Sequence, residues 1–422
     1  MRLLFASPHN YLDQTSGAAI STRESLLALV RAGWDVRVVC GGLCDDPQMK
    51  TTGVLQKIAQ KDFPCVLRKG SSTVRGQNAT WGEYNFKDSG IATSVFITND
   101  MFASSNRALW FASPSSEVFY RRLSKALDAY NPDIFATYGG DQRNALAAET
   151  VRNRGASTAF YLHNLEYRKP ELFKSFDSVI VPSEFAKRFY KEKLGIETVA
   201  IPPLIDETKV LADSNSREFV ALVNPALEKG RCFFIGIARE LGKIRPEIPF
   251  LVVDGRAKAK SICASSEGRA LQNLYWLPTT DEPRDFYKRT RVLLVPSLCE
   301  ESFGRTAVEG ALNSIPVLVS NRGALPEVVG DPRAVLPIPK RFEKYSKLIP
   351  TPEEVAPWVE LIVKLWDDDA LARELAASEK ASVANFSRKI VEEKTLALFE
   401  YLVNQKASEF RNAHSPDEPT PS

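Results

Sequence analysis

Two glutamates, Glu301 and Glu309, lie in a segment that combines a loop with the expected start of a helix. The segment begins at Pro296-Ser297, directly after an apolar run, and Gly304 stands between the two glutamates. A helix that begins after such a loop leaves backbone N–H groups without partners and carries a partial positive charge, and both features bind anions. Gly304 lets the backbone approach a ligand closely because it has no Cβ. The segment therefore predicts an anion site suited to a diphosphate.

The two carboxylates stand at different levels of this segment. Glu301 precedes the helix, whereas Glu309 lies one to two turns inside it. A ligand that straddles the helix start can meet both, one at each end of its diphosphate. Carboxylates accept strong hydrogen bonds from sugar hydroxyls. The pattern therefore favours a diphosphate with hydroxyl-bearing groups on both sides.

Apolar runs, glycine-bearing loops and amphipathic segments alternate in the first half of the chain. Residues 2–7 are apolar, a polar loop leads to Gly17, residues 19–31 are amphipathic, Gly33 ends them and residues 35–40 are again apolar. This order opens a doubly wound α/β domain. Residues 41–115 are expected to be irregular, with short strand-like pieces such as 94–98. We then expect helices at 115–129, 142–152 and, capped by Ser183, up to 194, and strands at 133–137, 158–162 and 178–181.

A second alternating series follows the stiff, proline-rich segment 200–206, which we interpret as an interdomain linker. We expect strands at 219–223, 250–253, 274–277, 292–295 and 317–320, and helices at 231–241, 284–289 and 305–313. The predicted fold class is therefore α/β, with two doubly wound Rossmann-like domains at 1–199 and 207–385. A helix is expected at 386–407, and the polar tail 408–422 is expected to be disordered.

Length, composition and cysteine usage exclude several classes of protein. A chain of 422 residues exceeds one domain of about 100–200 residues, and its hydrophobic and charged contents of 44% and 25% are ordinary for a globular protein. A net charge of +3 implies no general affinity for nucleic acid. The six cysteines form no CxxC pair, which argues against a disulfide framework and a structural zinc site. The apolar N-terminal stretch is too short for a signal peptide, and no run approaches the ~20 apolar residues of a spanning helix. We therefore expect a reduced, cytoplasmic protein.

The segment from Pro296 to Glu327 resembles the signature of the retaining GT-B glycosyltransferases of family four, which include phosphatidylinositol mannosyltransferases and sucrose synthases. The resemblance rests on Glu301, seven intervening residues and Glu309, with Phe303-Gly304 inside and Pro316-Val317 afterwards. Without the rest of the segment, the two glutamates would more simply indicate an acidic loop and a solvent-facing helix residue. The resemblance extends in order over nearly the whole chain. It implies a GT-B fold with the active site between two domains and a last helix that crosses back to the N-terminal domain.

The resemblance also implies roles for individual residues. Glu301 would grip the hydroxyls of the donor sugar, and His163 would act near the donor sugar and the acceptor, so these two are the predicted catalytic residues. Glu309 would hold the ribose of the donor. The other predicted donor-binding residues are Lys229, which would pair with the diphosphate, Phe303, Gly304, Arg305, Thr306, Gly17, Asn224 and Leu277, whose backbone would line the nucleobase.

Two positions depart from the family pattern. The family usually has an arginine five residues before its lysine, where this chain has Asn224, so one phosphate-facing charge is missing unless Arg256 or Arg305 supplies it. The usual pair of glycines near the diphosphate is reduced to Gly17-Ala18. These departures leave open a catalytically silent nucleotide-sugar binding protein. A nucleotide-sugar epimerase or a sugar phosphorylase of the same architecture is a further alternative, although the Glu301–Glu309 segment favours transfer.

The expected function is a metal-independent, retaining transfer of a sugar from a nucleotide-diphosphate sugar to an acceptor. The donor would be a UDP- or GDP-sugar, and the acceptor a sugar, a lipid-linked molecule or a small molecule. No resident cofactor is expected. The predicted acceptor residues are Asn10, Tyr11, Tyr138 and Asp141. The basic, aromatic segment 185–193 would suit a peripheral contact with the inner membrane face, although such helices more often pack their aromatic side chains inward. Asp367 and Asp369 imitate a metal-binding pair but indicate a solvated helix end.

Overall fold

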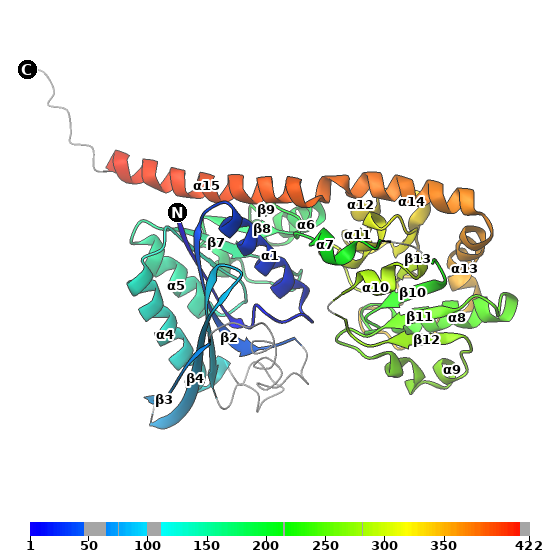
Figure 1. Ribbon diagram of the computed structural model, residues 1–422, viewed down its shortest axis with the longest axis horizontal. Helices are drawn as coiled ribbons and strands as arrows, with labels where there is room; N and C mark the ends of the chain where they lie inside the picture. Colours follow the sequence, from blue (N-terminus) through cyan, green and yellow to red (C-terminus); the bar gives the residue numbers. More distant parts are fainter. Residues whose placement is uncertain (46–64, 75, 99–110, 214–215, 281, 414–422) are drawn as a thin grey trace, which may run out of the picture. The chain divides into compact units, whose positions relative to one another are not determined.

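A computed structural model describes residues 1–45, 65–74, 76–98, 111–213, 216–280 and 282–413 (Figure 1). The chain divides into two compact units. The first takes in the described residues of Met1–Val181, Tyr190–Ile201 and Glu392–Ser422, and the second those of Pro182–Phe189 and Pro202–Val391. Each unit has its own sheet, and each is described by itself.

The sheet of unit 1 has the strand order β3-β4-β5-β2-β1-β6-β7-β8-β9 in the part of the chain that the structure describes. Its strands are β1 (Arg2–His9), β2 (Asp35–Leu43), β3 (Val66–Val74), β4 (Gln77–Asp88), β5 (Ile91–Thr98), β6 (Ile134–Thr137), β7 (Ser157–Tyr161), β8 (Ser178–Val181) and β9 (Val199–Ala200). The strands β5, β2, β1, β6, β7, β8 and β9 pair in parallel. The predicted parallel core around β1 is therefore confirmed.

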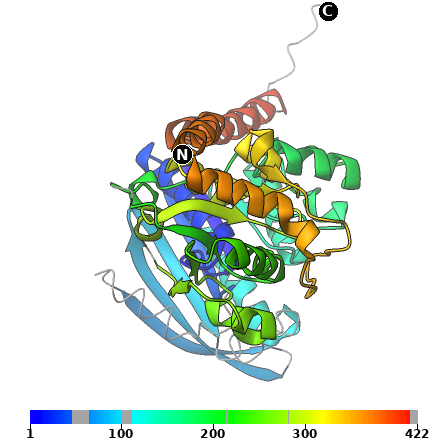
Figure 2. The ribbon, with the colours of Figure 1, turned by 90° about the vertical axis from the view of Figure 1, so that its right-hand side faces the viewer.

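The prediction that residues 41–115 are irregular is wrong for the strands β3 and β4, whereas the strand-like piece expected at 94–98 lies within β5. These strands pair antiparallel and extend one edge of the sheet, where Figure 2 shows them as long blue ribbons. The turn between β4 and β5 is Ser89-Gly90, and both residues have positive φ, 50° and 98°. Two such residues form the tight turn whose twist suits a hairpin. The edge strand β3 is mostly exposed and polar, so it lacks the apolar run that marks a strand in a sequence.

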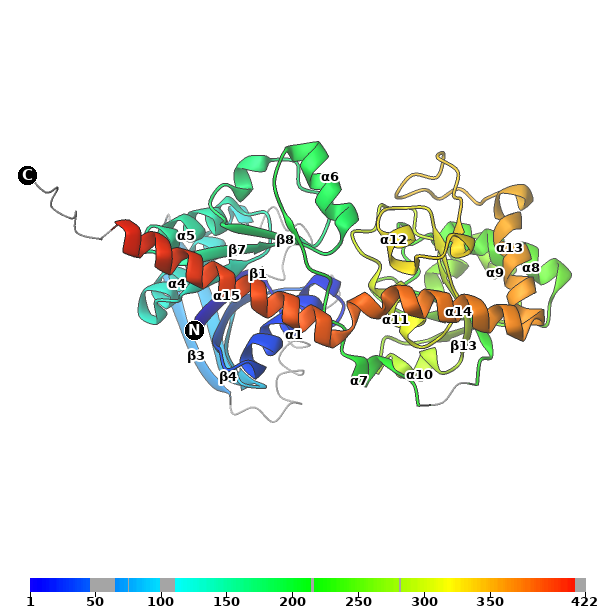
Figure 3. The same ribbon diagram turned by 90° about the horizontal axis from the view of Figure 1, so that it is seen from above.

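The helices of unit 1 follow its strands, and α15 packs on them from the end of the chain. They are α1 (Gly17–Arg31), α4 (Pro114–Tyr130), α5 (Gln142–Arg152), the short η1 (Pro170–Phe173), the later part of α6 (Glu184–Leu194) and α15 (Arg388–Ala413) from Glu392 onward. Figure 3 shows α15 running beside α1. Phe399 of α15 contacts the ring of Trp34 at 6.2 Å, and the carbonyl oxygen of Leu402 accepts a bond from Ser157 Oγ at 2.7 Å.

Unit 2 has a parallel sheet with the order β12-β11-β10-β13-β14-β15. Its strands are β10 (Phe219–Val223), β11 (Phe250–Val253), β12 (Leu274–Leu277), β13 (Thr290–Val295), β14 (Val317–Ser320) and β15 (Val335–Leu336). Its helices are the first part of α6, α7 (Glu207–Val210), α8 (Arg231–Ile244), η2 (Ala259–Ala264), α9 (Ser266–Arg269), α10 (Arg284–Tyr287), α11 (Arg305–Leu312), α12 (Leu325–Val329), η3 (Pro332–Ala334), α13 (Pro352–Asp367), α14 (Asp369–Val383), η4 (Ala384–Phe386) and the start of α15.

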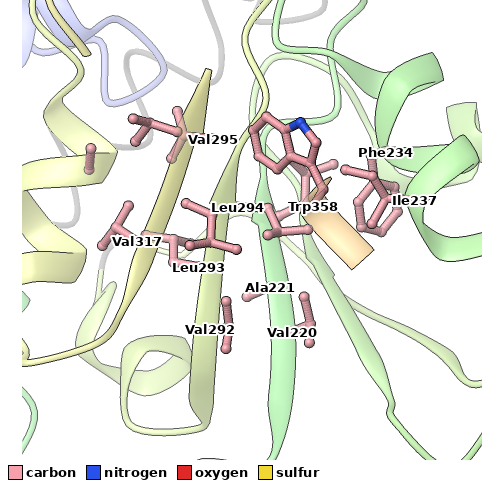
Figure 4. Packing of buried hydrophobic residues seen from close by; sticks show 14 of the residues in the cluster. Val220, Ala221, Phe234, Ile237, Val292, Leu293, Leu294, Val295, Val317 and Trp358 are labelled. Carbon is pink, nitrogen blue, oxygen red and sulfur yellow. The ribbon is translucent and has the colours of Figure 1, made fainter. Parts of the chain in front are cut away.

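The core of unit 2 lies against the central strands β10 and β13. Figure 4 shows Trp358 of α13 near Phe234 and Ile237 of α8, next to these strands. Trp358 is fully buried and meets the ring of Phe233 edge-on at 5.8 Å. Continuous apolar strands covered by helices are typical of parallel sheets, so the core holds the strand ends in fixed positions.

Two chain segments differ from their expected form. Helix α15 continues to Ala413, beyond the expected end at 407, and residues 414–422 lie outside the described part. Within the segment 200–206, Ala200 ends the short strand β9, and Asp206 caps α7 by accepting a bond from Thr208 N at 3.2 Å. This segment is therefore held by regular contacts at both of its ends.

Candidate active site

Three neighbouring parallel strands of unit 2 end at the same edge of the sheet, and each is followed by a loop that carries predicted site residues. β10 lies between β11 and β13, with Val223 opposite Val253 and Leu222 opposite Leu294. Lys229 lies in the loop after β10, and Glu301 lies in the loop after β13. Ligands of open α/β sheets bind at the carboxyl ends of the strands, so this edge is the candidate site.

Lys229 and Glu301 form an ion pair at this edge. Lys229 Nζ donates to both carboxylate oxygens of Glu301, at 2.6 and 2.8 Å, and Ser297 Oγ donates to Oε1 at 2.5 Å. The side chains are 26% and 12% exposed, so the pair is partly open to solvent. The sequence assigned Lys229 to the diphosphate and Glu301 to the sugar, and the structure brings the two residues into direct contact.

Burial and mutual charge act in opposite directions on this pair. Burial disfavours the ammonium of Lys229, but the carboxylate of Glu301 outweighs it and raises the pKa of the lysine. Burial likewise raises the pKa of Glu301, but Lys229 and Ser297 outweigh it and lower that pKa below its ordinary value. Both residues are therefore charged at neutral pH.

Glycines allow the loops around the pair to approach each other. A Cβ on Gly230, whose φ is 83°, would lie 1.9 Å from the carbonyl oxygen of Pro296. A Cβ on Gly323, whose φ is 63°, would lie 2.3 Å from both the backbone nitrogen and the oxygen of Glu301. Only glycine fits at these contacts, and they fix the backbone that carries Lys229 and Glu301.

The start of α11 supplies the predicted anion-binding backbone. Gly304 is its N-cap with a φ of 105°, and its carbonyl oxygen accepts bonds from Ala307 N at 2.9 Å and Val308 N at 3.3 Å. By helix geometry, the N–H groups of Arg305 and Thr306 precede the first intrahelical bond. The side chain of Phe303 is buried at 4% exposure, so only its backbone can face a ligand.

Glu309 is held inside unit 2 by two partners. It is 8% exposed, accepts a bond from the hydroxyl of Tyr287 at 2.8 Å, and pairs with Arg305 Nε at 2.6 Å. Arg305 also donates to the carbonyl oxygen of Leu204 at 3.1 Å. These bonds hold the carboxylate of Glu309 in a fixed position, about one turn inside α11.

Asn224 has a role in the backbone that the sequence did not indicate. Its φ is 56°, in the left-handed region that asparagine tolerates better than most residues. Its Oδ1 accepts a bond from Ala257 N at 3.0 Å and so ties the loop after β10 to the loop after β11. This geometry explains why an asparagine suits the position where the related pattern has arginine.

Leu277 ends β12 at the outer edge of the sheet. Its carbonyl oxygen accepts a bond from Asp254 N at 2.9 Å, which fixes this backbone beside the loop after β11. The preceding side chains, Tyr275 and Trp276, are 54% and 65% exposed. The structure thus places Leu277 at the same strand-end edge as Lys229, one strand beyond β11.

In unit 1, His163 follows β7 at the carboxyl edge of the sheet. Its Nε2 lies 2.9 Å from Thr22 Oγ1 on α1, and its ring stacks on Tyr161 at 5.8 Å and meets Tyr138 edge-on at 5.6 Å. Burial lowers the pKa of His163 to about 4. The imidazole is therefore neutral at physiological pH and acts as a hydrogen-bonding group, not as a cation.

Gly17 and the four predicted acceptor residues lie around the same edge of unit 1. Gly17 begins α1 after the N-cap Ser16, and a Cβ at this position would meet no atom within 4 Å. Asn10 and Tyr138 are 1% and 7% exposed, and Asn10 Nδ2 and the Tyr138 hydroxyl are buried without a hydrogen-bond partner in the described structure. Asp141 caps α5 by accepting from Arg143 N at 2.9 Å.

Tyr11, a predicted acceptor residue, has a buried side chain that is already hydrogen-bonded within unit 1, and its acceptor role stays a prediction. The side chain is 1% exposed, and its hydroxyl is 2.9 Å from Asp88 Oδ2 and 2.8 Å from Thr93 Oγ1. Asp88 also pairs with the buried Arg23 through two bonds of 2.7 Å. Tyr11 therefore belongs to a buried polar network that joins β4 and β5 to α1.

Comparisons with known proteins agree with this arrangement. Residues 207–379, which include Lys229, Glu301 and Glu309, match the family described as glycosyl transferases group 1. This part of the chain is therefore similar to a group 1 glycosyltransferase domain. The lipopolysaccharide 1,2-N-acetylglucosaminetransferase of Salmonella typhimurium is 27% identical over a match that covers 43% of this chain and 53% of that enzyme. The chain thus spans about half the length of this curated relative.

Solved glycosyltransferases share the fold of the whole chain. Sucrose-phosphate synthase from Thermosynechococcus elongatus aligns with a TM-score of 0.67 and 15% identity, covering 96% of this chain and 99% of that one. Anabaena HepE in complex with UDP and glucose aligns with a TM-score of 0.63 and 14% identity, covering 95% and 99%. The fold is therefore of the GT-B type, with two Rossmann-like domains, as predicted.

Other features that the sequence singled out have structural explanations. Asp367 pairs with Arg245 at 2.7 Å and Asp369 with Arg291 at 2.7 Å, as expected for a solvated helix end. Among the residues that the structure describes, no three His, Cys, Asp or Glu side chains gather in a way that could hold a metal ion. Each of the six cysteines is a free thiol.

The basic helix α6 has partners for several of its cations. Arg188 lies 3.7 Å from Glu327, Lys187 lies 3.6 Å from Glu184, and Lys191 pairs with Glu197. Over the described residues, no helix has both the length and the apolar character needed to cross a membrane.

Sequence reasoning missed several residues that position the site. Ser297 bonds Glu301, Tyr287 bonds Glu309, and Thr22 bonds His163. Only Ser297 had a signal, because it lies in the same loop as Glu301 and precedes it by four residues. The others are 22 and 141 positions from their partners, so only the fold brings them together.

Proposed function

We propose that the protein is a retaining glycosyltransferase that moves a sugar from a nucleotide-diphosphate sugar to an acceptor without a metal ion. The observation that carries the proposal is the Lys229–Glu301 pair in the strand-end loops beside the start of α11, within the group 1 glycosyltransferase domain. An ammonium and unpaired backbone N–H groups suit a diphosphate, and a carboxylate beside them suits a sugar hydroxyl.

The chemistry of the donor explains why these groups are useful. Breaking the bond between the sugar C1 and the diphosphate oxygen builds oxocarbenium character on the sugar and negative charge on the leaving group. Preorganised positive groups stabilise that leaving group in the transition state. Lys229 and the N–H groups of Arg305 and Thr306 supply this charge. The acceptor hydroxyl oxygen bonds to C1 on the face that the diphosphate leaves, and its proton passes to the departing phosphate, so the configuration is retained without the pair of carboxylates that glycosidases use.

The remaining residues have supporting roles in this proposal. Glu301 holds hydroxyls of the donor sugar once the donor has drawn Lys229 toward its phosphates. Glu309 binds the ribose, and Leu277 lines the base through its backbone. His163, neutral through its lowered pKa, bonds the donor sugar or the acceptor hydroxyl. The acceptor contacts fall to Asn10 and Tyr138, which carry buried polar atoms without partners in the described structure.

Testing the proposed activity requires a panel of donors, because the proposal does not specify the nucleobase of the donor. UDP-, GDP- and ADP-sugars are screened by thermal shift, since a ligand that binds the folded state raises the unfolding temperature with its concentration. The donor that binds is then incubated with candidate acceptors, and the release of nucleoside diphosphate is measured. Binding without any release of diphosphate would favour the silent binding protein over the transferase.

Glu301→Gln tests the role of the carboxylate in the chemical step. The amide keeps the size of the side chain but loses the charge that accepts strong hydrogen bonds from the sugar. We expect kcat to fall by about 10²-fold or more, whereas the Kd of the nucleoside diphosphate changes much less. Steady-state kinetics and calorimetry give the two values.

The matched control for this variant is Glu300→Gln. Glu300 is the adjacent residue and is exposed, so its change removes a carboxylate from the same loop without touching the pair. We expect nearly normal kcat from this control. A near-normal kcat in a folded Glu301→Gln protein would contradict the role assigned to Glu301.

A further inference from the structure

Arg256 lies in the loop after β11, beside the loop that carries Lys229. β10 and β11 pair in parallel, with Val223 opposite Val253, so both loops leave the sheet at the same edge. The side chain of Arg256 is exposed, whereas that of Lys229 is 26% exposed. A ligand at this edge can therefore meet Lys229 from one strand end and Arg256 from the next.

Asn224 fixes the two loops against each other. Its Oδ1 accepts from Ala257 N at 3.0 Å, immediately after Arg256. Gly255, immediately before Arg256, packs so closely that a Cβ there would lie 2.6 Å from Asn224 Cβ. Asn224 thus holds the backbone on both sides of Arg256.

The hydrogen bond of Asn224 disfavours an arginine in its place. Arginine has no side-chain acceptor, so it would remove the bond that Ala257 N makes. The charge missing from this position must therefore come from a neighbouring loop if the site has a second phosphate-binding cation.

The electrostatics of the site place Arg256 within range of the ion pair. Burial raises the pKa of Glu301, and Lys229 is the main charge that lowers it, but Arg256 lowers it as well. Arg256 also acts on Lys229, where its like charge opposes the increase in pKa that Glu301 causes. Two cations and one carboxylate thus share this edge of the sheet.

We propose that Arg256 binds the donor diphosphate together with Lys229 and supplies the cation that Asn224 lacks. The proposal rests on the proposed function, because it assumes a nucleotide-diphosphate donor. A guanidinium presents several N–H groups in one plane and can bond two phosphate oxygens at once, whereas an ammonium acts as a point charge. The two loops would then bind the diphosphate from two sides.

Calorimetry on the full chain tests this role with three variants. Arg256→Gln removes the charge, Arg256→Lys keeps it, and Lys260→Gln removes a nearby exposed cation as the matched control. The probes are UDP, GDP and ADP, together with the uncharged nucleoside of whichever diphosphate binds the wild-type protein. We expect Arg256→Gln to raise the Kd of that diphosphate about tenfold, Arg256→Lys to recover part of the loss, and Lys260→Gln to change little.

The nucleoside separates a phosphate contact from a general disturbance of the loop. We expect its Kd to stay the same in all three variants, because it has no phosphate for Arg256 to bind. An Arg256→Gln protein that binds the diphosphate like the wild type would overturn the role of Arg256 and leave the proposed function standing. A loss that is equal for nucleoside and diphosphate would also overturn it. A wild-type protein that binds none of the three diphosphates would contradict the proposed function itself.

Discussion

Lys229 and Glu301 neutralise each other, so a donor that bonds to both must rearrange their hydrogen bonds. Each has lost part of its water, and a partly buried ion pair gains its stability only while both charges are present. A donor diphosphate offers Lys229 a second anion, and the donor sugar offers Glu301 hydroxyl donors. The ion pair thus keeps both charged groups in place for a ligand whose diphosphate bonds to Lys229 and whose sugar bonds to Glu301.

Lys229→Ala is predicted to weaken the binding of the nucleoside diphosphate by about 1.5–3 kcal/mol, the usual contribution of a hydrogen bond to a charged group. The variant also leaves the carboxylate of Glu301 partly buried without its main partner, which is destabilising. Titration calorimetry measures the first effect, and denaturant unfolding measures the second.

The control for this loss is the double variant Lys229→Ala with Glu301→Gln. It removes both charges, so we expect it to recover stability relative to Lys229→Ala alone while diphosphate binding remains weak. Unchanged affinity in a folded Lys229→Ala protein would rule out a contact between this lysine and the phosphates.

At the scale of the elements, the sequence predicted those strands whose bounds are set by a local pattern of apolar residues. The apolar runs at β10, β11, β12 and β14 gave the observed bounds, because each of these parallel strands consists largely of consecutive apolar residues. The hairpin strands β3 and β4 were missed because their residues are largely polar and half-exposed, and the pairing that defines them lies in the backbone. The contact of Lys229 with Glu301 joins residues 72 positions apart, so no local pattern could show it.

Helix α14 carries a buried carboxyl group whose titration depends on folding. Glu379 is 0% exposed and accepts a bond from Val317 N at 2.9 Å, at the start of β14. Burial is the main cause that raises its pKa to about 9. The nearby Asp331 also raises this pKa, whereas the bond from Val317 N lowers it. The folded protein therefore holds a proton on Glu379 at neutral pH, whereas the unfolded chain releases it near the ordinary pKa of 4.5.

The contribution of Glu379 to the stability of the wild type should consequently fall as pH rises. Because the folded pKa is the higher one, the contribution of Glu379 is fully present below pH 4.5 and is lost as pH rises toward 9. Each pH unit in this window costs at most about 1.4 kcal/mol. Glu379→Gln keeps an acceptor for Val317 N and does not titrate, so we expect the variant to gain stability over the wild type between pH 6 and pH 8.5.

Denaturant unfolding at several pH values measures this difference. Glu360→Gln is the matched control, because Glu360 is exposed on the neighbouring helix α13 and should show the slope of the wild type. If the Glu379→Gln protein lost stability with pH as steeply as the wild type, Glu379 would not be the titrating group.

At the scale of the whole molecule, the GT-B fold could be predicted because two independent series of strands and helices announce two Rossmann-like domains. The two compact units interleave around residues 182–201 and again at Glu392, whereas the predicted domains are continuous stretches of the chain. The linker at 200–206 and the domain bounds therefore stay predictions. The roles of His163 in one unit and of Glu301 in the other likewise remain predictions. Kinetic measurements on variants of both residues would test whether they act in the same reaction.

We expect the proposed reaction to be independent of metal ions because of where positive charge lies in unit 2. Diphosphate chemistry needs positive charge, and many enzymes supply it with Mg²⁺ held by carboxylates. Here the ammonium of Lys229 and the N–H groups at the start of α11 lie at the same edge of the sheet. Arg256 is the further cation that we propose at this edge. The carboxylate of Glu301 is already bonded by Lys229 and Ser297, so a cation there would have to displace the lysine.

We therefore expect transfer to continue in excess EDTA with a rate changed by less than a few-fold, and added Mg²⁺ or Mn²⁺ to have a similarly small effect. The assay measures release of nucleoside diphosphate before and after chelation, with the same preparation dialysed back into Mg²⁺ as its control. A protein that falls silent in EDTA and recovers with Mg²⁺ or Mn²⁺ would show that the cations of unit 2 do not suffice for the leaving diphosphate.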